Sequence, residues 1–146
     1  TLSKKSYIAL PNLSEACLLS GVRYSRIQTK ESILNICKKL EDKGIKRFVI
    51  TGIRTNEGMI LAYCDDGVVK FIPTQEVKGD FLGSGDVFAS TLTGALANGL
   101  TLSQSLDVAV KYTQKTVKVT SLDKSHWYGL KFEKTIPYLL ELVQNK

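Results

Sequence analysis

The sequence predicts an α/β fold in which helices flank part of a mostly parallel sheet that carries a β-hairpin. Short apolar runs alternate with longer segments whose apolar residues recur at helical spacing, which is typical of layered α/β domains. The dipeptide Asp66-Gly67 separates two extended runs and is a strong signal for a hairpin turn. A glycine-rich motif then opens a long apolar segment that reads as a helix.

The first half of the chain is predicted to contain two helices, a buried strand and the hairpin. Pro11 stops a short extended segment, and Gly21 ends the helix that follows it. Thr29 can cap the second helix, because its hydroxyl can accept a hydrogen bond from the first turn. The predicted ranges are 6–10 (extended), 13–20 (helix), 29–43 (helix), 48–51 (strand), and 58–65 with 67–72 (hairpin).

The second half is predicted to be helical. Small and apolar residues fill a first helix over 87–98, which Gly99 ends. Ser103 is the candidate N-cap of the next helix, over 102–120, and a last helix covers 136–143. The 146 residues are enough for one ordinary domain with a sizeable core.

Composition narrows the classes of function. The formal net charge of +6 suits an anionic ligand, but the lysines are dispersed and aromatic residues do not interleave with them, so nucleic acid is not the expected partner. No apolar run is long enough to cross a membrane, and no secretory signal is expected. Cys17, Cys37 and Cys64 lie far apart, which predicts packing residues in a reducing cytosol. His126, the only histidine, is expected to be a loop or surface residue, and the alternative is that it contacts an adenine ring beside Trp127 and Tyr128.

Gly83-Ser84-Gly85-Asp86 is the motif most directly linked to chemistry. Glycines allow consecutive N–H groups to converge on one anion, and the following helix adds its positive amino-terminal dipole. A carboxylate there repels phosphate, so it makes sense as a base for a hydroxyl that attacks a phosphoryl group. The motif therefore suggests phosphoryl transfer. The alternative is a plain helix N-cap, with Ser84 or Asp86 bonding the first N–H groups.

Two further motifs precede the glycine motif in a fixed order. Asn12-Leu-Ser-Glu15 follows Pro11, and Val49-Ile-Thr-Gly52 ends the predicted strand. Taken alone, Asn12 can be a turn or cap residue, Glu15 a first-turn acid favoured by the helix dipole, and Thr51-Gly52 simply a strand that ends in a loop.

Taken together, the three motifs resemble those of the ribokinase-like family of small-molecule kinases, and within it the vitamin B6 kinase branch. The segment after Asp86 (Val-Phe-Ala-Ser90) and the tail Tyr128-Gly-Leu-Lys-Phe-Glu133 resemble that branch too. Two positions depart from the wider family pattern. Many members have Thr at the position of Leu10, and sugar kinases have paired Thr or Asp-Thr at the position of Phe81-Leu82. The second departure fits the vitamin kinases better than ribokinase or fructokinase.

The resemblance implies a role for each motif. Asp86 would be the catalytic base, and the three residues before it would form the anion hole for the phosphoryl group: Gly83, Ser84 and Gly85. Asn12 would serve ATP and, with Glu15, would organise Mg²⁺ through water. Thr51 and Gly52 would line the path of the ATP phosphates.

The resemblance also implies the extent and partners of the protein. Residues 1–146 would be the carboxy-terminal, ATP-binding part of a ribokinase-like domain whose amino-terminal half is absent, so the chain alone would not be a competent kinase. The implied ligands are ATP, Mg²⁺ and a B6 vitamer, and a monovalent cation is a further possible ligand. The intact enzyme would be a cytoplasmic homodimer, without nucleic-acid or membrane partners. Two alternatives stay open: a hydroxymethylpyrimidine kinase of thiamine synthesis, and a non-catalytic nucleotide-binding module.

Overall fold

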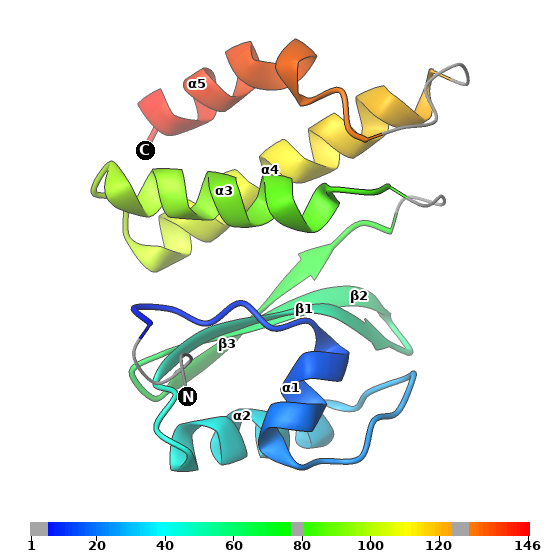
Figure 1. Ribbon diagram of the computed structural model, residues 1–146, viewed down its shortest axis with the longest axis vertical. Helices are drawn as coiled ribbons and strands as arrows, with labels where there is room; N and C mark the ends of the chain where they lie inside the picture. Colours follow the sequence, from blue (N-terminus) through cyan, green and yellow to red (C-terminus); the bar gives the residue numbers. More distant parts are fainter. Residues whose placement is uncertain (1–5, 77–80, 124–128) are drawn as a thin grey trace. The chain divides into compact units, whose positions relative to one another are not determined.

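The computed structural model describes residues 6–76, 81–123 and 129–146. They fall into two compact units, an amino-terminal unit (Thr1–Glu76) and a carboxy-terminal unit (Val77–Lys146). The amino-terminal unit contains a sheet with two helices, whereas the described part of the carboxy-terminal unit is helical (Figure 1). In both units the predicted helices are present, and the α/β class is confirmed.

The sheet of the amino-terminal unit has three antiparallel strands in the order β1-β2-β3. They are β1 (Arg47–Thr55), β2 (Gly58–Asp65) and β3 (Val68–Thr74). Asp66 and Gly67 form the predicted turn between β2 and β3, with φ angles of 46° and 88°. Two consecutive positive φ angles are the signature of the turn whose twist matches that of a hairpin.

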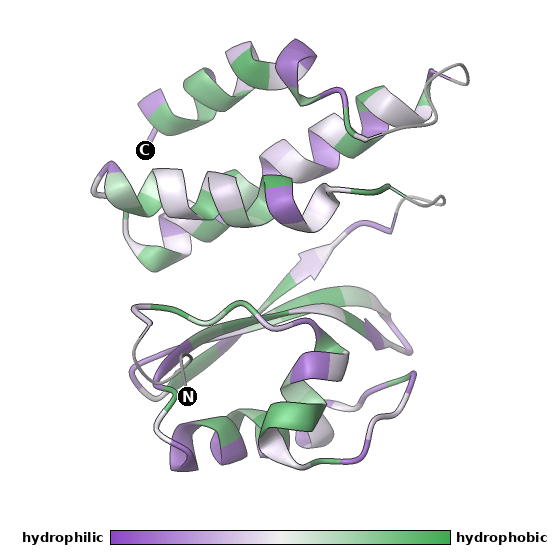
Figure 2. Cartoon of the chain, viewed as in Figure 1, coloured by the Kyte–Doolittle hydropathy of each residue, from purple (hydrophilic) through white to green (hydrophobic). Residues whose placement is uncertain are grey.

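Helices α1 (Leu13–Ser20) and α2 (Lys30–Asp42) cover one face of this sheet (Figure 1). The predicted apolar face of α2 is fully buried, and hydrophobic residues line the strands that it meets (Figure 2). This packing supplies most of the stability of the unit, because buried apolar area is the main favourable term in folding. The buried core consists of Leu13, Ala16, Cys17, Ile33, Ile36, Cys37, Leu40, Ile45, Phe48, Ile50, Ile53, Ala62 and Cys64.

The predicted mostly parallel sheet is not formed by the described strands, which all pair antiparallel. Among the described residues, parallel pairing occurs only as isolated bridges, between Ala9 and Phe48 and between Asn12 and Thr51. Ala9 accepts from Val49 N (2.8 Å) and donates to Arg47 O (3.0 Å). The ladder cannot continue regularly, because Pro11, between the two bridges, has no N–H group to donate. The segment before α1 therefore runs beside β1 without becoming a strand.

The carboxy-terminal unit packs α3 (Ser84–Ala97) against α4 (Leu102–Ser121), with η2 (Phe132–Thr135) and α5 (Ile136–Gln144) also in contact with α4. The N-cap of α4 is Thr101 and not the predicted Ser103. The Thr101 hydroxyl accepts from Gln104 N (3.3 Å), and the Gln104 side chain accepts from Thr101 N (3.0 Å). This reciprocal capping box satisfies two backbone donors at once, which a cap at Ser103 would leave unpaired.

Candidate functional site

The glycine motif forms the start of α3. The helix begins at Ser84, three residues before the predicted Val87, so Ser84, Gly85 and Asp86 form its first turn. Gly83 is the N-cap and has a left-handed backbone (φ 86°, ψ 0°), a conformation that glycine adopts without steric cost. The motif is therefore a turn at a helix amino terminus, as predicted.

The start of α3 has no side-chain cap. Neither Ser84 nor Asp86 bonds the first turn, so the N-cap alternative does not describe this motif. Ser84 N donates to Phe81 O (3.2 Å) and Val87 N to Gly83 O (2.9 Å). Within the described residues, the N–H groups of Gly85 and Asp86 have no acceptor. Unpaired N–H groups at a helix start, together with the helix dipole, favour an anion.

Exposure at this helix start leaves room for a ligand. Gly85 and Asp86 are exposed and Ser84 is half-buried. Gly85 does not have a positive φ, and a Cβ atom added to it would meet nothing within 4 Å. Neither backbone conformation nor packing among the described residues therefore requires glycine at position 85. A ligand that approaches the backbone closely would require it.

In the amino-terminal unit, Asn12 and Glu15 form a capping box at the start of α1. The Asn12 side chain accepts from Glu15 N (2.9 Å), and Glu15 Oε2 accepts from Asn12 N (2.9 Å). Asn12 is thus a helix cap and Glu15 a first-turn acid, the structural roles that the local pattern allowed, since each side chain satisfies a backbone donor of the other residue. Both residues are exposed, and Oε1 of Glu15 accepts no hydrogen bond from the described residues.

Thr51 and Gly52 lie at a β-bulge and not at the end of a strand as predicted. Strand β1 continues to Thr55, and its register with β2 shifts by one residue between Ile50 and Ile53. Gly52 absorbs the shift with a φ of 70°. Bulges are over-represented beside active sites, where they redirect the chain. Thr51 and Gly52 therefore remain candidate ligand-binding residues.

The bulge lies next to the capping box of α1. Thr51 N donates to Pro11 O (3.1 Å), and Asn12 bridges Thr51 in the parallel direction. The structure thus brings Asn12, Glu15, Thr51 and Gly52 together where the segment parallel to β1 ends and α1 begins. Ligands of α/β proteins commonly bind at such a point.

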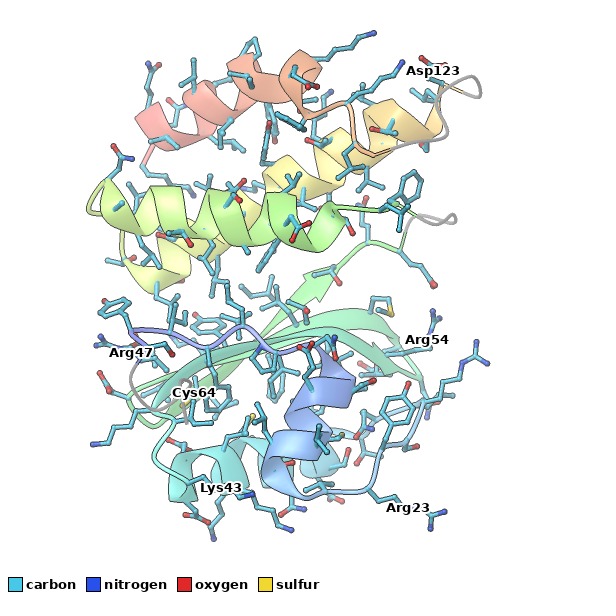
Figure 3. The ribbon with its side chains drawn as sticks, in the orientation of Figure 1. Arg23, Lys43, Arg47, Arg54, Cys64 and Asp123 are labelled. Carbon is cyan, nitrogen blue, oxygen red and sulfur yellow. The ribbon has the colours of Figure 1, made fainter. Side chains whose placement is uncertain are left out.

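The three cysteines are free and buried, as predicted for packing residues. Burial, together with the neighbouring Cys64 and Glu41, raises the pKa of Cys37 to about 12. Burial also raises the pKa of Cys64, labelled in Figure 3, to about 11. The Cys64 thiol donates to Glu41 Oε1 (3.4 Å). The thiols are protonated at neutral pH and are poor nucleophiles.

Sequence reasoning missed the exposed ion pair between Arg54 and Glu76. The two residues lie 22 positions apart, so no local pattern marks them. His126 and Trp127 lie outside the described residues. Among the described residues, no group of three His, Cys, Asp or Glu side chains could hold a metal ion, and no helix is long and apolar enough to cross a membrane.

Comparison with known proteins places the chain in a family. Three solved pyridoxal kinases resemble it. That of Entamoeba histolytica has a TM-score of 0.79 and 23% identity, and the match covers 97% of this chain and 50% of the relative. That of Lactobacillus plantarum has a TM-score of 0.74 and 24% identity, with coverage of 94% of this chain and 50% of the relative, and that of Leishmania donovani, in complex with ADP and ginkgotoxin, has a TM-score of 0.75 and 24% identity, with coverage of 95% and 49%. At this identity the likeness shows a shared fold, and the chain spans about half the length of each relative. No curated protein matches. A model of the phosphomethylpyrimidine kinase family matches residues 1–130, and the chain therefore belongs to that family, within the ribokinase-like kinases.

Proposed function

We propose that residues 1–146 are the ATP-binding, carboxy-terminal part of a kinase domain. The complete domain would transfer the γ-phosphoryl group of ATP to the hydroxymethyl group of pyridoxal, pyridoxine or pyridoxamine. Family membership supports a kinase, and the Leishmania relative solved with ADP supports ATP as the donor. The Entamoeba relative, a pyridoxal kinase, supports a B6 vitamer as the acceptor.

The start of α3 is the observation that carries this proposal. Gly83 turns the backbone, the first turn has no side-chain cap, and the N–H groups of Gly85 and Asp86 have no acceptor among the described residues. A phosphoryl group is the ligand that uses both these donors and the helix dipole. A helix built only for stability would instead have a capping side chain, as Asn12 provides for α1 and Thr101 for α4.

In the proposed reaction, Asp86 acts as the general base. The acceptor hydroxyl oxygen attacks the γ-phosphorus, its proton passes to the Asp86 carboxylate, and the bond to the bridging oxygen of ADP breaks. Gly83, Ser84 and Gly85 are assigned to the anion hole. Because the Ser84 N–H group already donates to Phe81 O, the donors proposed for the phosphoryl oxygens are the N–H groups of Gly85 and Asp86, which would stabilise the developing charge. Asp86 can take this role because its carboxylate makes no cap hydrogen bond.

The residues of the amino-terminal unit are assigned to ATP and its metal ion. Thr51, Gly52 and Asn12 would follow the phosphates, and Glu15 would hold Mg²⁺ through water. Glu15 fits this role because one of its carboxylate oxygens remains unbonded within the described residues, and Mg²⁺ often binds one carboxylate, several waters and substrate phosphates. When bound, Mg²⁺ neutralises charge on the phosphates. A bound monovalent cation is also proposed, and only the family resemblance supports it.

We also propose how the rest of the fold completes the sheet. The parallel bridges of Ala9 and Asn12 to β1 support further parallel strands beyond the segment 6–12, supplied by the half of the domain that the relatives possess. The acceptor pocket would lie largely in that half. A homodimer is proposed from the family resemblance, and the free, buried thiols support a reducing cytoplasm.

A second candidate function is the phosphorylation of hydroxymethylpyrimidine in thiamine synthesis. The description of the matching family favours it. The complete domain should be assayed with ATP, Mg²⁺ and each acceptor in turn. We expect the highest kcat/KM with a B6 vitamer. A higher value with hydroxymethylpyrimidine would establish the second function, and absence of transfer to every acceptor would support the remaining alternative, a non-catalytic nucleotide-binding module.

A further inference from the structure

The side chain of Arg47 holds the start of the segment 6–12, which runs beside β1 (Figure 1). Cζ of Arg47 lies over the Tyr7 ring, 4.9 Å from its centroid, which is cation–π geometry. Its Nε donates to Asp65 Oδ1 (2.9 Å) and its Nη2 to Asp66 Oδ2 (2.7 Å). These two acids fix the guanidinium beside the hairpin turn, so that it forms a platform on which the Tyr7 ring packs.

Backbone hydrogen bonds attach the rest of the segment to β1, but they do not select its register. Ala9 N donates to Arg47 O (3.0 Å), and Ala9 O accepts from Val49 N (2.8 Å). Further along, Thr51 N donates to Pro11 O (3.1 Å). A shift of the segment by two residues would present equivalent carbonyl groups to β1, because the strand repeat is two residues. Side chains must therefore determine the register.

Two side chains of the segment are placed to do this, one near each end. Pro11 is buried close to the end of the segment, and Tyr7 lies against Arg47 at its start. In the register that results, Asn12 bridges Thr51 at the bulge. A shift by two residues would move Asn12 along β1 by roughly 7 Å, which would separate the start of α1 from the bulge.

Resting on the proposed function, we propose that Tyr7 and Arg47 are a positioning pair for Asn12 and Glu15. By fixing the start of the segment on β1, the pair sets the place of the capping box of α1, to which ATP and Mg²⁺ are assigned. All these contacts lie among the described residues of the amino-terminal unit. Tyr7 and Arg47 touch no reacting atom.

Exposure separates this role from a role in stability. Tyr7 is 67% exposed, so its removal uncovers little of the core, and the expected effect is local to the segment 6–12. Tyr138 provides a matched control in the carboxy-terminal unit, because Lys115 Nζ lies 5.9 Å from the centroid of its ring. Tyr138→Ala thus removes the same kind of contact as Tyr7→Ala, from a helix that does not include the segment.

The first test measures amide hydrogen exchange in the complete domain without ligands. The Val49 and Thr51 amides report directly on the segment, because they donate to Ala9 O and Pro11 O. The Ile50 amide is an internal control. Since N–H groups alternate in direction along a strand, that of Ile50 faces β2.

We expect Tyr7→Ala to accelerate exchange at the Val49 and Thr51 amides by about two- to fivefold, with no change at Ile50. Tyr7→Phe keeps the ring and should exchange like the wild type, as should Tyr138→Ala. Unchanged exchange in Tyr7→Ala overturns the proposal, whether or not the protein is a kinase. Acceleration of the same size at Ile50, or in Tyr7→Phe, overturns it too.

The second test measures the Mg²⁺ concentration needed for half-maximal phosphoryl transfer. We expect Tyr7→Ala to raise it by about two- to fivefold, because the binding-competent placement of Asn12 and Glu15 becomes less populated. The melting temperature should stay within about 3 °C of the wild-type value, and Tyr7→Phe and Tyr138→Ala should keep the wild-type Mg²⁺ requirement. An active wild-type enzyme whose Mg²⁺ requirement is the same in Tyr7→Ala overturns the positioning role alone. An inactive wild-type protein overturns the proposed function and leaves exchange to decide the pair.

Discussion

The two glycines of the proposed phosphoryl-binding turn, residues 83–86, have different physical requirements. Gly83 has a left-handed backbone, so an alanine there would be strained by roughly 1 kcal/mol or more. Gly85 is helical, and a Cβ atom there would meet nothing within 4 Å. We expect Gly83→Ala to lower the free energy of unfolding and Gly85→Ala to leave it unchanged or slightly raised.

The same two variants should affect nucleotide binding in a way that stability does not explain. Gly85→Ala places a methyl group where the phosphoryl group is proposed to approach the backbone, so ATP affinity and kcat should both fall. Calorimetric titration with ATP, alongside chemical denaturation, separates the two effects. If Gly85→Ala binds ATP as tightly as the wild type, Gly85 does not contact the nucleotide. Gly94→Ala, further along α3 and also without a close contact, is the control.

The buried thiols predict how stability depends on pH. The pKa values of Cys37 and Cys64 in the folded state, about 12 and about 11, lie above the unfolded value of about 8.5. Their contribution is therefore fully present below pH 8.5 and declines as the pH rises toward the folded values, by up to about 1.4 kcal/mol per pH unit for each thiol. Cys37→Ala should weaken this decline in denaturation curves recorded from pH 8 to 10.5. An unchanged slope would show that Cys37 does not cause it.

At the scale of single residues, sequence reasoning located the motif but not its hydrogen bonds. Gly83 and Asp86 stood out because two glycines before an apolar helix are unusual. The sequence could not decide whether Asp86 caps α3, because an acid in the first turn is compatible with both roles. The structure decides this point, since α3 has no side-chain cap. The Arg54–Glu76 pair was invisible because only the tertiary fold brings its members together.

The capping box of α1 allows the structural and the proposed metal-binding roles of Glu15 to be separated. Glutamine can replace glutamate in a capping box, because its side-chain oxygen can still accept from the N-cap N–H group. Glu15→Gln should therefore keep the melting temperature of the wild type while raising the Mg²⁺ concentration needed for half-maximal turnover. Thermal denaturation and a magnesium titration of activity test this.

Asn12→Ala provides the complementary result. Loss of an N-cap side chain costs about 1 kcal/mol, so this variant should unfold at lower temperature or denaturant concentration, and Asn12→Ser should be close to wild type. A Glu15→Gln variant with an unchanged Mg²⁺ requirement would confine Glu15 to its structural role, and the metal ion would then need other ligands.

At the scale of elements, periodicity predicted helices well and strand pairing poorly. The apolar face of α2 and the Asp66-Gly67 turn arise from local rules, and both are present. The parallel sheet was an inference from alternating elements, and the described strands do not show it, because β1 pairs antiparallel with the hairpin. The bulge at Gly52 was missed, since a glycine in a strand also suits a strand end. The early start of α3 was missed because glycine and serine are weak helix formers.

At the scale of the whole molecule, the chain corresponds to about half of a known kinase fold. Pyridoxal kinases of about twice its length share the fold over most of this chain. The chain expressed alone should show no turnover with pyridoxal, because the acceptor pocket is proposed to lie in the other half. Full activity of the isolated 146-residue chain as a monomer, measured by coupled ADP release and light scattering, would contradict that division.

The most direct test of the account is the turnover of Asp86→Asn in the complete domain. Asparagine keeps the size and capping ability of aspartate but cannot accept the proton as a carboxylate does. We expect kcat to fall by about 10²–10⁴-fold, with ATP affinity unchanged or slightly higher because a negative charge beside the phosphates is removed. Near-wild-type turnover of Asp86→Asn, with normal ATP binding, would contradict the assignment of Asp86 as the base and with it the proposed phosphoryl-transfer mechanism.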